Sequence, residues 1–342
     1  MLKTLKKIAR RLTNRPDKDY EVMPVTGETA FNWKHLGDQR LYTDNNYALQ
    51  FLENNENPDS QIPVKEKIIY HAYWYGNIGR KQAFSIKSFL CTQDLTKCRV
   101  ILWLDADNGY LYHEKNPILK AILPFIEVKA YDPYQEIKNT PWKNSQKLVN
   151  EPENLAKRSD AFRFLVLYKY GGLYFDLDVM FLKDFGGLLD SEFCYAWETQ
   201  PYANSAILSL KKKSNLSAYI LNKGIKKRTV LPWIILNYSD SYLKKLHVLP
   251  CAFFDPVWQG LASAKSPLDD FPDFFRKFDD QFTNRLGIES YKDFFPGCYA
   301  YHWHNQWKKT EYEDSLFGIF ENDFNKHLNI ESKSKKQELH AV

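Results

Sequence analysis

The chain has few of the features that mark disulfide-rich, zinc-binding or membrane-spanning proteins. Its 342 residues include only five cysteines, which are widely scattered and form no Cys-x-x-Cys pair. This pattern argues against a zinc site and predicts reduced thiols in the core. No apolar run approaches the roughly 20 residues that a membrane-spanning helix needs. The sequence also contains no internal repeat and no low-complexity tract, so a globular chain is expected.

A strong charge bias is lacking as well. The 47 basic residues are nearly balanced by 42 acidic ones, and no concentrated basic stripe of the kind found in nucleic-acid binders is present. We therefore expect no nucleic-acid partner. Basic and apolar residues do alternate near helical spacing in residues 1–15, which predicts either a helix on an anionic membrane surface or a solvated helical arm. Without a signal-peptide core, the expected location is the cytoplasm, peripheral to the cytoplasmic face of a membrane.

What the sequence does contain is an alternation of apolar strands and helices. Strands are predicted at residues 67–74 and 99–105, with a helix from Lys81 to Leu90 between them. This order predicts an α/β fold with a mostly parallel sheet, whose ligands gather at the carboxyl ends of the strands. We divide the chain into a basic helix and polar leader with a short helical stretch (1–60), a main domain (61–325) and a polar tail (326–342).

The most informative stretch runs from residue 155 to residue 185. Leu155–Tyr170 is apolar on nearly every face, which predicts a buried helix, and two glycines follow to end it. The next residues, LYFDLDVMF, predict one strand on which Asp176 and Asp178 project to the same side. A carboxylate pair among apolar residues is costly unless a cation compensates it, and oxygen ligands suit Mg²⁺ or Mn²⁺. The alternative is a solvated strand end whose carboxylates pair with Lys or Arg.

The predicted buried helix also carries charged residues. Asp160 and Arg163 are three residues apart and share a face, with Ser159 beside them. Buried charges are expected to be paired or functional. The pair is therefore either an internal salt bridge or a group that hydrogen-bonds the hydroxyls of a sugar.

The stretch SDAFRFLVLYKYGGLYFDLDV resembles the DXD-containing sugar-binding region of glycosyltransferase family 32, the Och1-like and capsular-polysaccharide enzymes, and a segment of the clostridial glucosylating toxins. The shared pattern is Ser-Asp-x-x-Arg followed by Leu-Tyr-x-x-Gly-Gly-x-Tyr-x-Asp-x-Asp, and all of it is present, although it covers under a tenth of the chain. The resemblance implies a GT-A fold, a Rossmann-like sheet flanked by helices with helical additions. It also implies that the chain transfers a hexose from a nucleotide sugar with retention of configuration, and a UDP-sugar is favoured over GDP-mannose as the donor. The implied acceptor is a saccharide or lipid-linked glycan in surface polysaccharide synthesis, such as that of a capsule.

The same resemblance assigns roles to individual residues. It implies that Asp176 contacts ribose, sugar or metal and that Asp178 ligates the metal, Mn²⁺ or Mg²⁺. The opening KIIYHAYWYG resembles the family's first strand and nucleotide-binding loop, in which His71, Tyr73 and Trp74 either contact base and ribose or belong to the buried core. A second Asp-x-Asp begins at Asp105, which we assign to nucleotide contact or to loop structure. The residues expected around the donor are His71, Tyr73, Trp74, Asp105, Ser159, Asp160, Arg163 and Tyr174.

The C-terminal stretch YAYHWHNQWKKT resembles the family's closing HHWxxSW segment. His302 matches a histidine of that segment, whereas Tyr301 and Gln306 depart from it. His302 and Lys308 have the spacing of the metal-binding histidine and the phosphate-binding lysine of retaining GT-A enzymes. The resemblance thus implies His302 as third metal ligand, with His304 as its rival, and Lys308 as a contact of the diphosphate.

Two other functions fit parts of the sequence. The FDLDV stretch resembles the motif of phosphatases of the haloacid dehalogenase type, in which the first Asp is a nucleophile. Those enzymes usually carry Thr or Val where Met180 stands, and their motif lies near the start of the domain. The other alternative is a catalytically silent sugar-binding protein, against which the intact set of charged motif residues argues.

Overall fold

The computed structural model describes residues 37–55, 66–149, 154–197, 200–258, 266–279 and 287–330. The predicted basic helix at residues 1–15 lies outside the described residues, as do residues 331–342 of the predicted tail. No helix within the described ranges is long and apolar enough to cross a membrane. The strands are β1 (Ile68–Trp74), β2 (Cys98–Asp105), β3 (Glu127–Tyr131), β4 (Gly172–Phe175), β5 (Val179–Phe181), β6 (Phe193–Ala196), β7 (Ala203–Leu210), β8 (His247–Leu249) and β9 (Ala300–His302).

The longer helices are α3 (Asn45–Asn54), α4 (Arg80–Thr92), α7 (Leu155–Tyr170), α8 (Asn215–Lys227) and α11 (Leu316–His327). Short helices are α2 (Arg40–Thr43), α5 (Pro117–Lys120), α6 (Pro133–Glu136) and α9 (Pro232–Ile235). Short 3₁₀ segments are η2 (Tyr110–Lys115), η3 (Leu123–Phe125), η4 (Gln146–Leu148), η5 (Gly186–Asp190), η6 (Ser241–Lys245), η7 (Cys251–Phe253), η8 (Phe271–Phe275) and η9 (Tyr291–Asp293). The helices predicted in the leader and at residues 81–90 are confirmed as α3 and α4.

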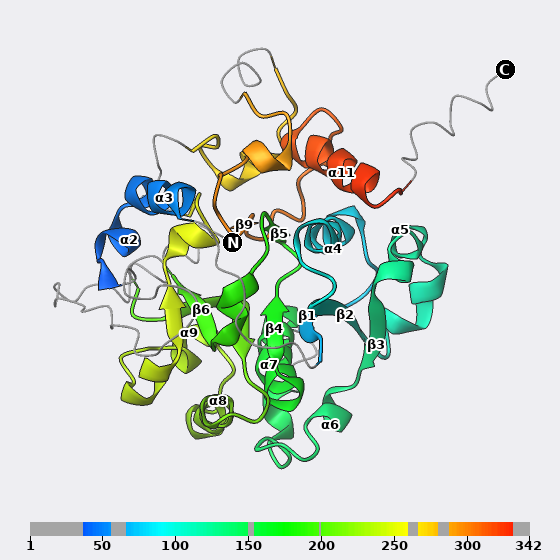
Figure 1. Cartoon of the computed structure of the whole chain (residues 1–342). Helices are drawn as coiled ribbons and strands as arrows, with labels where there is room; N and C mark the ends of the chain where they lie inside the picture. The colour runs from blue at the N-terminus through cyan, green and yellow to red at the C-terminus, as the bar shows by residue number, and fades with distance from the viewer. Residues whose placement is uncertain are drawn as a thin grey trace.

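A seven-stranded sheet in the order β3-β2-β1-β4-β7-β6-β8 forms the centre of the molecule (Figure 1). Only β7 runs antiparallel to its neighbours in this sheet. The predicted α/β architecture, a mostly parallel sheet flanked by helices with helical additions, is therefore confirmed. A separate two-stranded sheet pairs β5 with β9.

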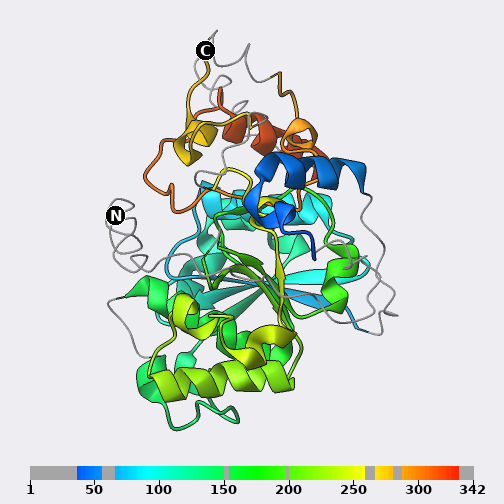
Figure 2. The same cartoon turned by 90° about the vertical axis from the view of Figure 1, so that its left-hand side faces the viewer.

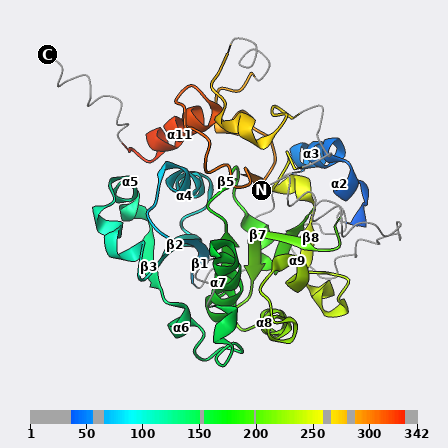
Figure 3. The same cartoon turned by 180° about the vertical axis from the view of Figure 1, so that it is seen from behind.

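Helices cover both faces of the large sheet, as the layers in Figure 2 show. Helices α7 and α8 pack together on one face, and α4 and α11 pack together on the other (Figure 3). Successive side chains of β2 alternate between the two cores: Leu102 belongs to the core under α4, whereas Trp103 belongs to the core under α7. Burial on both faces explains why the sequence of this strand is apolar without alternation.

The join between α7 and β4 depends on two glycines. Gly171 and Gly172 have φ angles of 70° and 100°, which residues with a side chain rarely adopt. A Cβ atom on Gly172 would lie 2.1 Å from the carbonyl oxygen of Ile69. The glycine pair therefore lets the chain reverse at once from α7 into the strand beside β1, which carries the next residues to the carboxyl edge of the sheet.

His71, on β1, is completely buried and ties together three parts of the sheet. The indole Nε1 of Trp103 donates a hydrogen bond to His71 Nδ1 at 3.1 Å, and His71 Nε2 donates to the Gly171 carbonyl at 2.9 Å. Burial lowers the pKa of His71 to about 4, against the opposing effect of the Gly171 carbonyl. Both ring nitrogens are engaged, so a nucleotide contact through them would require one of these bonds to break.

This arrangement predicts that His71 makes stability depend on pH. Because its pKa is about 4 in the folded chain and 6.5 in the unfolded chain, the stabilisation is complete above pH 6.5 and is lost as the pH falls from 6.5 toward 4. The full change is about 3 kcal/mol. Urea unfolding of wild type and His71→Gln at about pH 7 and about pH 4.5 measures it, and the stability gap between the two proteins should narrow at the lower pH. An equal gap at both pH values contradicts this role.

Candidate active site

The two aspartates of the DXD motif lie in a turn. Strand β4 ends at Phe175, and β5 starts at Val179, whose amide donates a hydrogen bond to the Asp176 carbonyl at 3.1 Å. The predicted single strand through LYFDLDVMF is therefore wrong. The physical reason is that β5 leaves the large sheet to pair with β9, while its side chains stay buried in the core under α4.

The turn nevertheless brings the predicted metal ligands together. Pairing of β5 with β9 places His302 opposite Val179, so His302 Nε2 lies 3.2 Å from Asp178 Oδ1. The backbone amide of Asn305 donates to Asp178 Oδ2 at 2.8 Å. Ligand atoms of Asp176, Asp178 and His302 all lie within 4.8 Å of one another. These three side chains, called here the DXD cluster, occupy the carboxyl edge of the sheet, where α/β sheets bind ligands.

The electrostatics of the DXD cluster favour a bound cation. Burial raises the pKa of Asp176, against the opposing effect of Arg163. Burial would also raise the pKa of Asp178, but His302 and the Asn305 amide lower it to about 2, so this carboxylate is ionised at neutral pH. Two carboxylates and one imidazole form a ligand set that fits Mg²⁺ or Mn²⁺. The Asp176 side chain is 25% exposed, which leaves one side of the cluster open.

Arg163 connects α7 to the DXD cluster. Its guanidinium Nη2 lies 3.3 Å from Asp160 and 3.1 Å from Asp176, and its Nη1 donates to the Ser205 carbonyl at 2.9 Å. Burial raises the pKa of Asp160 to about 7, against the opposing charge of Arg163. The internal salt bridge, one of the two interpretations of this pair, is thus present. It also extends to the motif, so the same guanidinium sets the position of Asp176.

Tyr174 and Ser159 hold Asp176 through a chain of hydrogen bonds. The Tyr174 hydroxyl donates to Asp176 Oδ1 at 2.5 Å, and the Ser159 hydroxyl lies 2.8 Å from the Tyr174 hydroxyl. Only 1% of Tyr174 is exposed, and the Arg163 guanidinium stacks 4.6 Å above its ring. In this structure both residues hold the motif in place, and their contact with a donor sugar stays a prediction.

The residues predicted around the nucleotide lie at the ends of β1 and β2. The carboxylate of Asp105 is buried and forms an ion pair with Arg158, and the Tyr73 hydroxyl lies 3.4 Å from it. Trp74 is half-buried, and its ring lies 4.9 Å from that of Trp307. Asp105 thus links the end of β2 to α7 and β1, whereas its predicted role in nucleotide contact or loop structure, and nucleotide contact by the other residues, stay predictions.

Lys308 is exposed on the loop formed by residues 305–309. Hydrogen bonds from the buried Lys81 hold the backbone of this loop in place. Lys81, on α4, is 2% exposed, and its ammonium donates hydrogen bonds to the carbonyls of Gln306 at 2.7 Å, Trp307 at 3.2 Å and Lys309 at 2.5 Å. Sequence reasoning missed Lys81 because its partners lie more than 220 positions away. Through this loop Lys81 fixes the backbone next to Asp178.

We expect Lys81→Met to lower the free energy of unfolding by about 3 kcal/mol. The substitution removes the ammonium group that now donates hydrogen bonds to three backbone carbonyls and leaves these carbonyls without that donor. Lys120→Met, which changes an exposed lysine on α5, serves as the matched control. Chemical denaturation of both variants measures the difference. Equal stability of the two variants would show that the ammonium does not hold the loop.

Asp255 is the residue of this region that sequence reasoning missed most clearly. It follows η7 and is 1% exposed, and its Oδ2 lies 2.5 Å from His304 Nε2 and 3.8 Å from His302 Nδ1. The Tyr195 hydroxyl lies 3.0 Å from His302 Nδ1. His304, the rival metal ligand, groups with Asp255 and His302 and not with the two aspartates of the motif. A single acid inside the apolar run CAFFDPVW was the only signal in the sequence.

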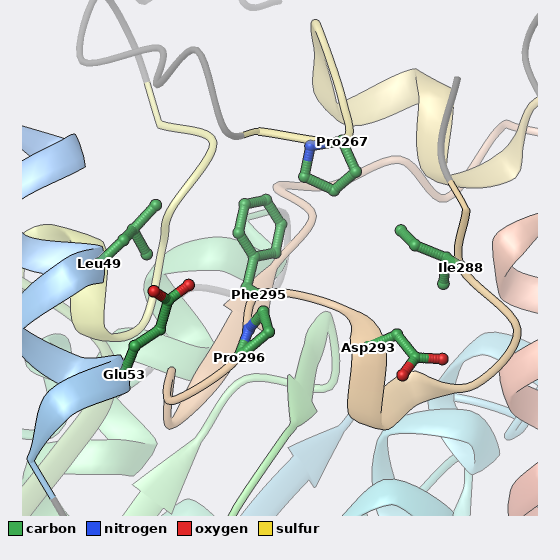
Figure 4. Close-up of a pocket in the computed structure, with 7 residues that line it drawn as sticks. All are labelled: Leu49, Glu53, Pro267, Ile288, Asp293, Phe295 and Pro296. Atoms are coloured by element: carbon green, nitrogen blue, oxygen red, sulfur yellow. The ribbon is translucent and has the colours of Figure 1, made fainter. Parts of the chain in front are cut away.

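A cavity with no residue of the DXD cluster in its wall lies between α3, Pro267 and the chain at residues 288–296 (Figure 4). Apolar side chains, among them Leu49 and Phe295, form most of its wall, and Glu53 and Asp293 add two carboxylates. The cavity therefore plays no part in the chemistry considered for the motif.

Comparison with protein families identifies the segment that carries the motif. Residues 89–195 match the glycosyltransferase sugar-binding region containing a DXD motif. The match spans α7, Arg163 and the turn with both aspartates, and it ends before Asp255 and His302. It supports a transferase and the coarser part of the resemblance found in the sequence. No curated protein matches the chain.

Similar solved structures include several glycosyltransferases. The PaToxG glycosyltransferase is 20% identical, with a TM-score of 0.42 over 56% of this chain and 72% of that one. The galactosyltransferase LgtC, solved with donor and acceptor sugar analogues, is 12% identical, with a TM-score of 0.46 over 80% of this chain and 100% of that one. GlyE of Streptococcus pneumoniae is 11% identical, with a TM-score of 0.40 over 77% of this chain and 62% of that one. Because these sequence identities and TM-scores are low, we assign no residue of this chain a role from the three structures.

Proposed function

We propose that the chain is a metal-dependent glycosyltransferase that transfers a hexose from a nucleotide sugar with retention of configuration. The observation that carries the proposal is the convergence of Asp176, Asp178 and His302 at the carboxyl edge of the sheet. The family match over the same motif supports it. A UDP-sugar is the favoured donor, with GDP-mannose as the alternative, on the basis of the motif resemblance.

The DXD cluster would hold Mn²⁺ or Mg²⁺, which neutralises charge on the departing diphosphate when it is bound. Lys308, exposed on the loop beside Asp178, is assigned to the same diphosphate. Asp160 and Arg163 are assigned to the donor sugar: Asp160 accepts hydrogen bonds from hydroxyls, and Arg163 keeps both carboxylates of its network in position. No side chain is assigned as a covalent nucleophile, so the acceptor hydroxyl attacks from the face that the diphosphate leaves.

The geometry disfavours the phosphatase alternative, which needs Asp176 as a nucleophile. The Tyr174 hydroxyl donates to Asp176 Oδ1, and the Arg163 guanidinium contacts both carboxylate oxygens. Donors of this kind stabilise the anion and draw electron density away from attack on phosphorus. The carboxylate is better arranged to orient a bound group than to react.

We assign the acceptor to a saccharide or lipid-linked glycan in surface polysaccharide synthesis, such as that of a capsule. This assignment rests on the family resemblance and on the basic residues 1–15, which we assign to peripheral contact with the cytoplasmic face of a membrane. The acceptor itself has to be found by experiment.

A donor screen by thermal shift tests the function. Purified protein is mixed with a panel of UDP- and GDP-sugars in Mn²⁺, and one nucleotide sugar is expected to raise the melting temperature. Addition of a chelator should abolish the shift. Slow release of free nucleoside diphosphate in the presence of that sugar confirms transfer or hydrolysis, whereas release of phosphate from phosphomonoesters supports the phosphatase. If neither nucleoside diphosphate nor phosphate is released with any substrate, a sugar-binding protein without activity is favoured.

A further inference from the structure

We propose that Asp255, His302 and His304 form a second cation site, rich in nitrogen and suited to Zn²⁺, which shares His302 with the DXD cluster. We call these three residues the His-Asp-His site. The site uses no cysteine, so the scattered cysteines, which argue against a zinc site built on thiolates, do not bear on it. The site itself rests on the geometry of described residues. Only its effect on catalysis, given below, rests on the proposed transferase function.

The distances within the His-Asp-His site suit a small cation. One ligand atom from each residue lies within 4.8 Å of the other two. Oδ2 of Asp255 lies 2.5 Å from His304 Nε2 and 3.8 Å from His302 Nδ1. A tetrahedral zinc site with bonds of about 2.0 to 2.1 Å keeps its ligand atoms about 3.3 Å apart. The two observed separations lie on either side of this value, so small side-chain shifts are enough to accommodate the ion.

The charge of the region leaves room for a second cation. Asp160, Asp176, Asp178 and Asp255 place four carboxylates in one connected group, and Arg163 is the guanidinium that pairs with two of them. Asp255 Oδ1 is buried and has no hydrogen-bond partner among the described residues. A buried carboxylate oxygen without a partner is costly, so a ligand is expected there. A cation bound by both carboxylate oxygens of Asp255 would satisfy Oδ1, since Oδ2 is the oxygen that faces the two histidines.

The ligand types and the surroundings favour Zn²⁺ over Mn²⁺ at this site. Many zinc sites consist of two imidazoles, one carboxylate and a water in the fourth position. The DXD cluster, with two carboxylates and one imidazole, is richer in oxygen. The rings of Trp258 and Phe271 lie 4.3 Å and 4.5 Å from the ring of His304 and form an apolar wall. The Tyr195 hydroxyl, 3.0 Å from His302 Nδ1, would give up this contact to the ion.

The shared histidine couples the two sites. His302 presents Nε2 to Asp178 and Nδ1 to Asp255. A neutral imidazole carries a proton on one nitrogen and a lone pair on the other, so it ligates one ion at a time. Zn²⁺ at the His-Asp-His site therefore removes a ligand from the DXD cluster. If the proposed function holds, Zn²⁺ inhibits the Mn²⁺-dependent transfer, and excess Mn²⁺ relieves the inhibition.

Zn²⁺ titration by calorimetry of the full chain, freed of metal by chelation, tests the site. Wild type and Asp178→Asn should each bind one Zn²⁺ with similar affinity. His304→Gln and Asp255→Asn should bind it at least about 100-fold more weakly, because each loses a ligand. His247→Gln, which removes a histidine on β8, is the matched control and should bind like wild type. Loss of Zn²⁺ binding in Asp178→Asn with full binding in His304→Gln would overturn the inference.

Cobalt substitution keeps the test decisive if either ligand variant fails to fold. Co²⁺ bound to wild type and to Asp178→Asn should give the intense visible absorption of tetrahedral coordination. The faint spectrum of octahedral Co²⁺ in both proteins would contradict a site of this kind. The proposed function fails separately, when no nucleotide sugar binds wild type in Mn²⁺, and that outcome leaves the Zn²⁺ and Co²⁺ results unchanged.

Discussion

Asp178→Asn is expected to lower the rate of Mn²⁺-dependent sugar transfer by about 10³-fold while the chain stays folded. The carboxylate of Asp178 faces His302 Nε2 at 3.2 Å and accepts the Asn305 amide, so it is the fixed ligand of the DXD cluster. Asparagine keeps the shape and one acceptor oxygen but removes the charge that binds the cation. His302 and the Asn305 amide lower the pKa of Asp178 to about 2, so they favour the ionised carboxylate, and the substitution weakens both contacts without unfolding the chain.

Release of nucleoside diphosphate at saturating donor, with and without Mn²⁺, measures this effect. Asp107→Asn changes an exposed aspartate of the other Asp-x-Asp sequence and is the matched control. The control should retain the activity of wild type. If the Mn²⁺-dependent turnover of Asp178→Asn is within a few-fold of that of wild type, the motif takes no part in the reaction.

Arg163→Met is expected to lower the free energy of unfolding by about 3 to 5 kcal/mol and to abolish activity. The guanidinium pairs with Asp160 at 3.3 Å and with Asp176 at 3.1 Å, and its removal leaves one buried and one partly buried carboxylate without their cation. The Ser205 carbonyl also loses its donor. Few single substitutions in this chain should cost as much.

Urea denaturation at neutral pH measures the loss for Arg163→Met. The double variant Asp160→Asn and Arg163→Met also removes the carboxylate of Asp160, which the single variant leaves unpaired, and should recover part of the stability. Recovery in the double variant separates the loss of charge pairing from the loss of packing. A single variant as stable as wild type would show that the network contributes nothing to the fold.

The sequence predicted helices and strands well where local pattern decides the structure. Leu155–Tyr170 is apolar on nearly every face, and α7 has the same bounds. The prediction failed at residues 173–181, where apolar residues interrupted by Asp176 and Asp178 fit one strand as well as two strands joined by a turn. The break is set by β9, whose residues lie some 120 positions later and pair with β5. Pairing at such a distance leaves no local signal.

The site shows the same division between local and distant information. The two aspartates of the motif could be named from the sequence, and the resemblance added His302 as the third ligand. Asp255 and Lys81 could not be predicted, because each acts on partners from remote segments: one histidine at the end of β9 and one just after it, and three carbonyls of the loop at 305–309. Their residue types, one buried acid and one helical lysine, carry no distinctive pattern.

Mn²⁺ binding followed by electron paramagnetic resonance tests the central claim most directly, because it reports the cation without requiring a known acceptor. Wild type should bind one Mn²⁺ per chain, more tightly with UDP or GDP present, and Asp178→Asn and His302→Gln should each weaken it strongly. Equal Mn²⁺ binding by all three proteins, or none by wild type with either nucleotide, would contradict the account.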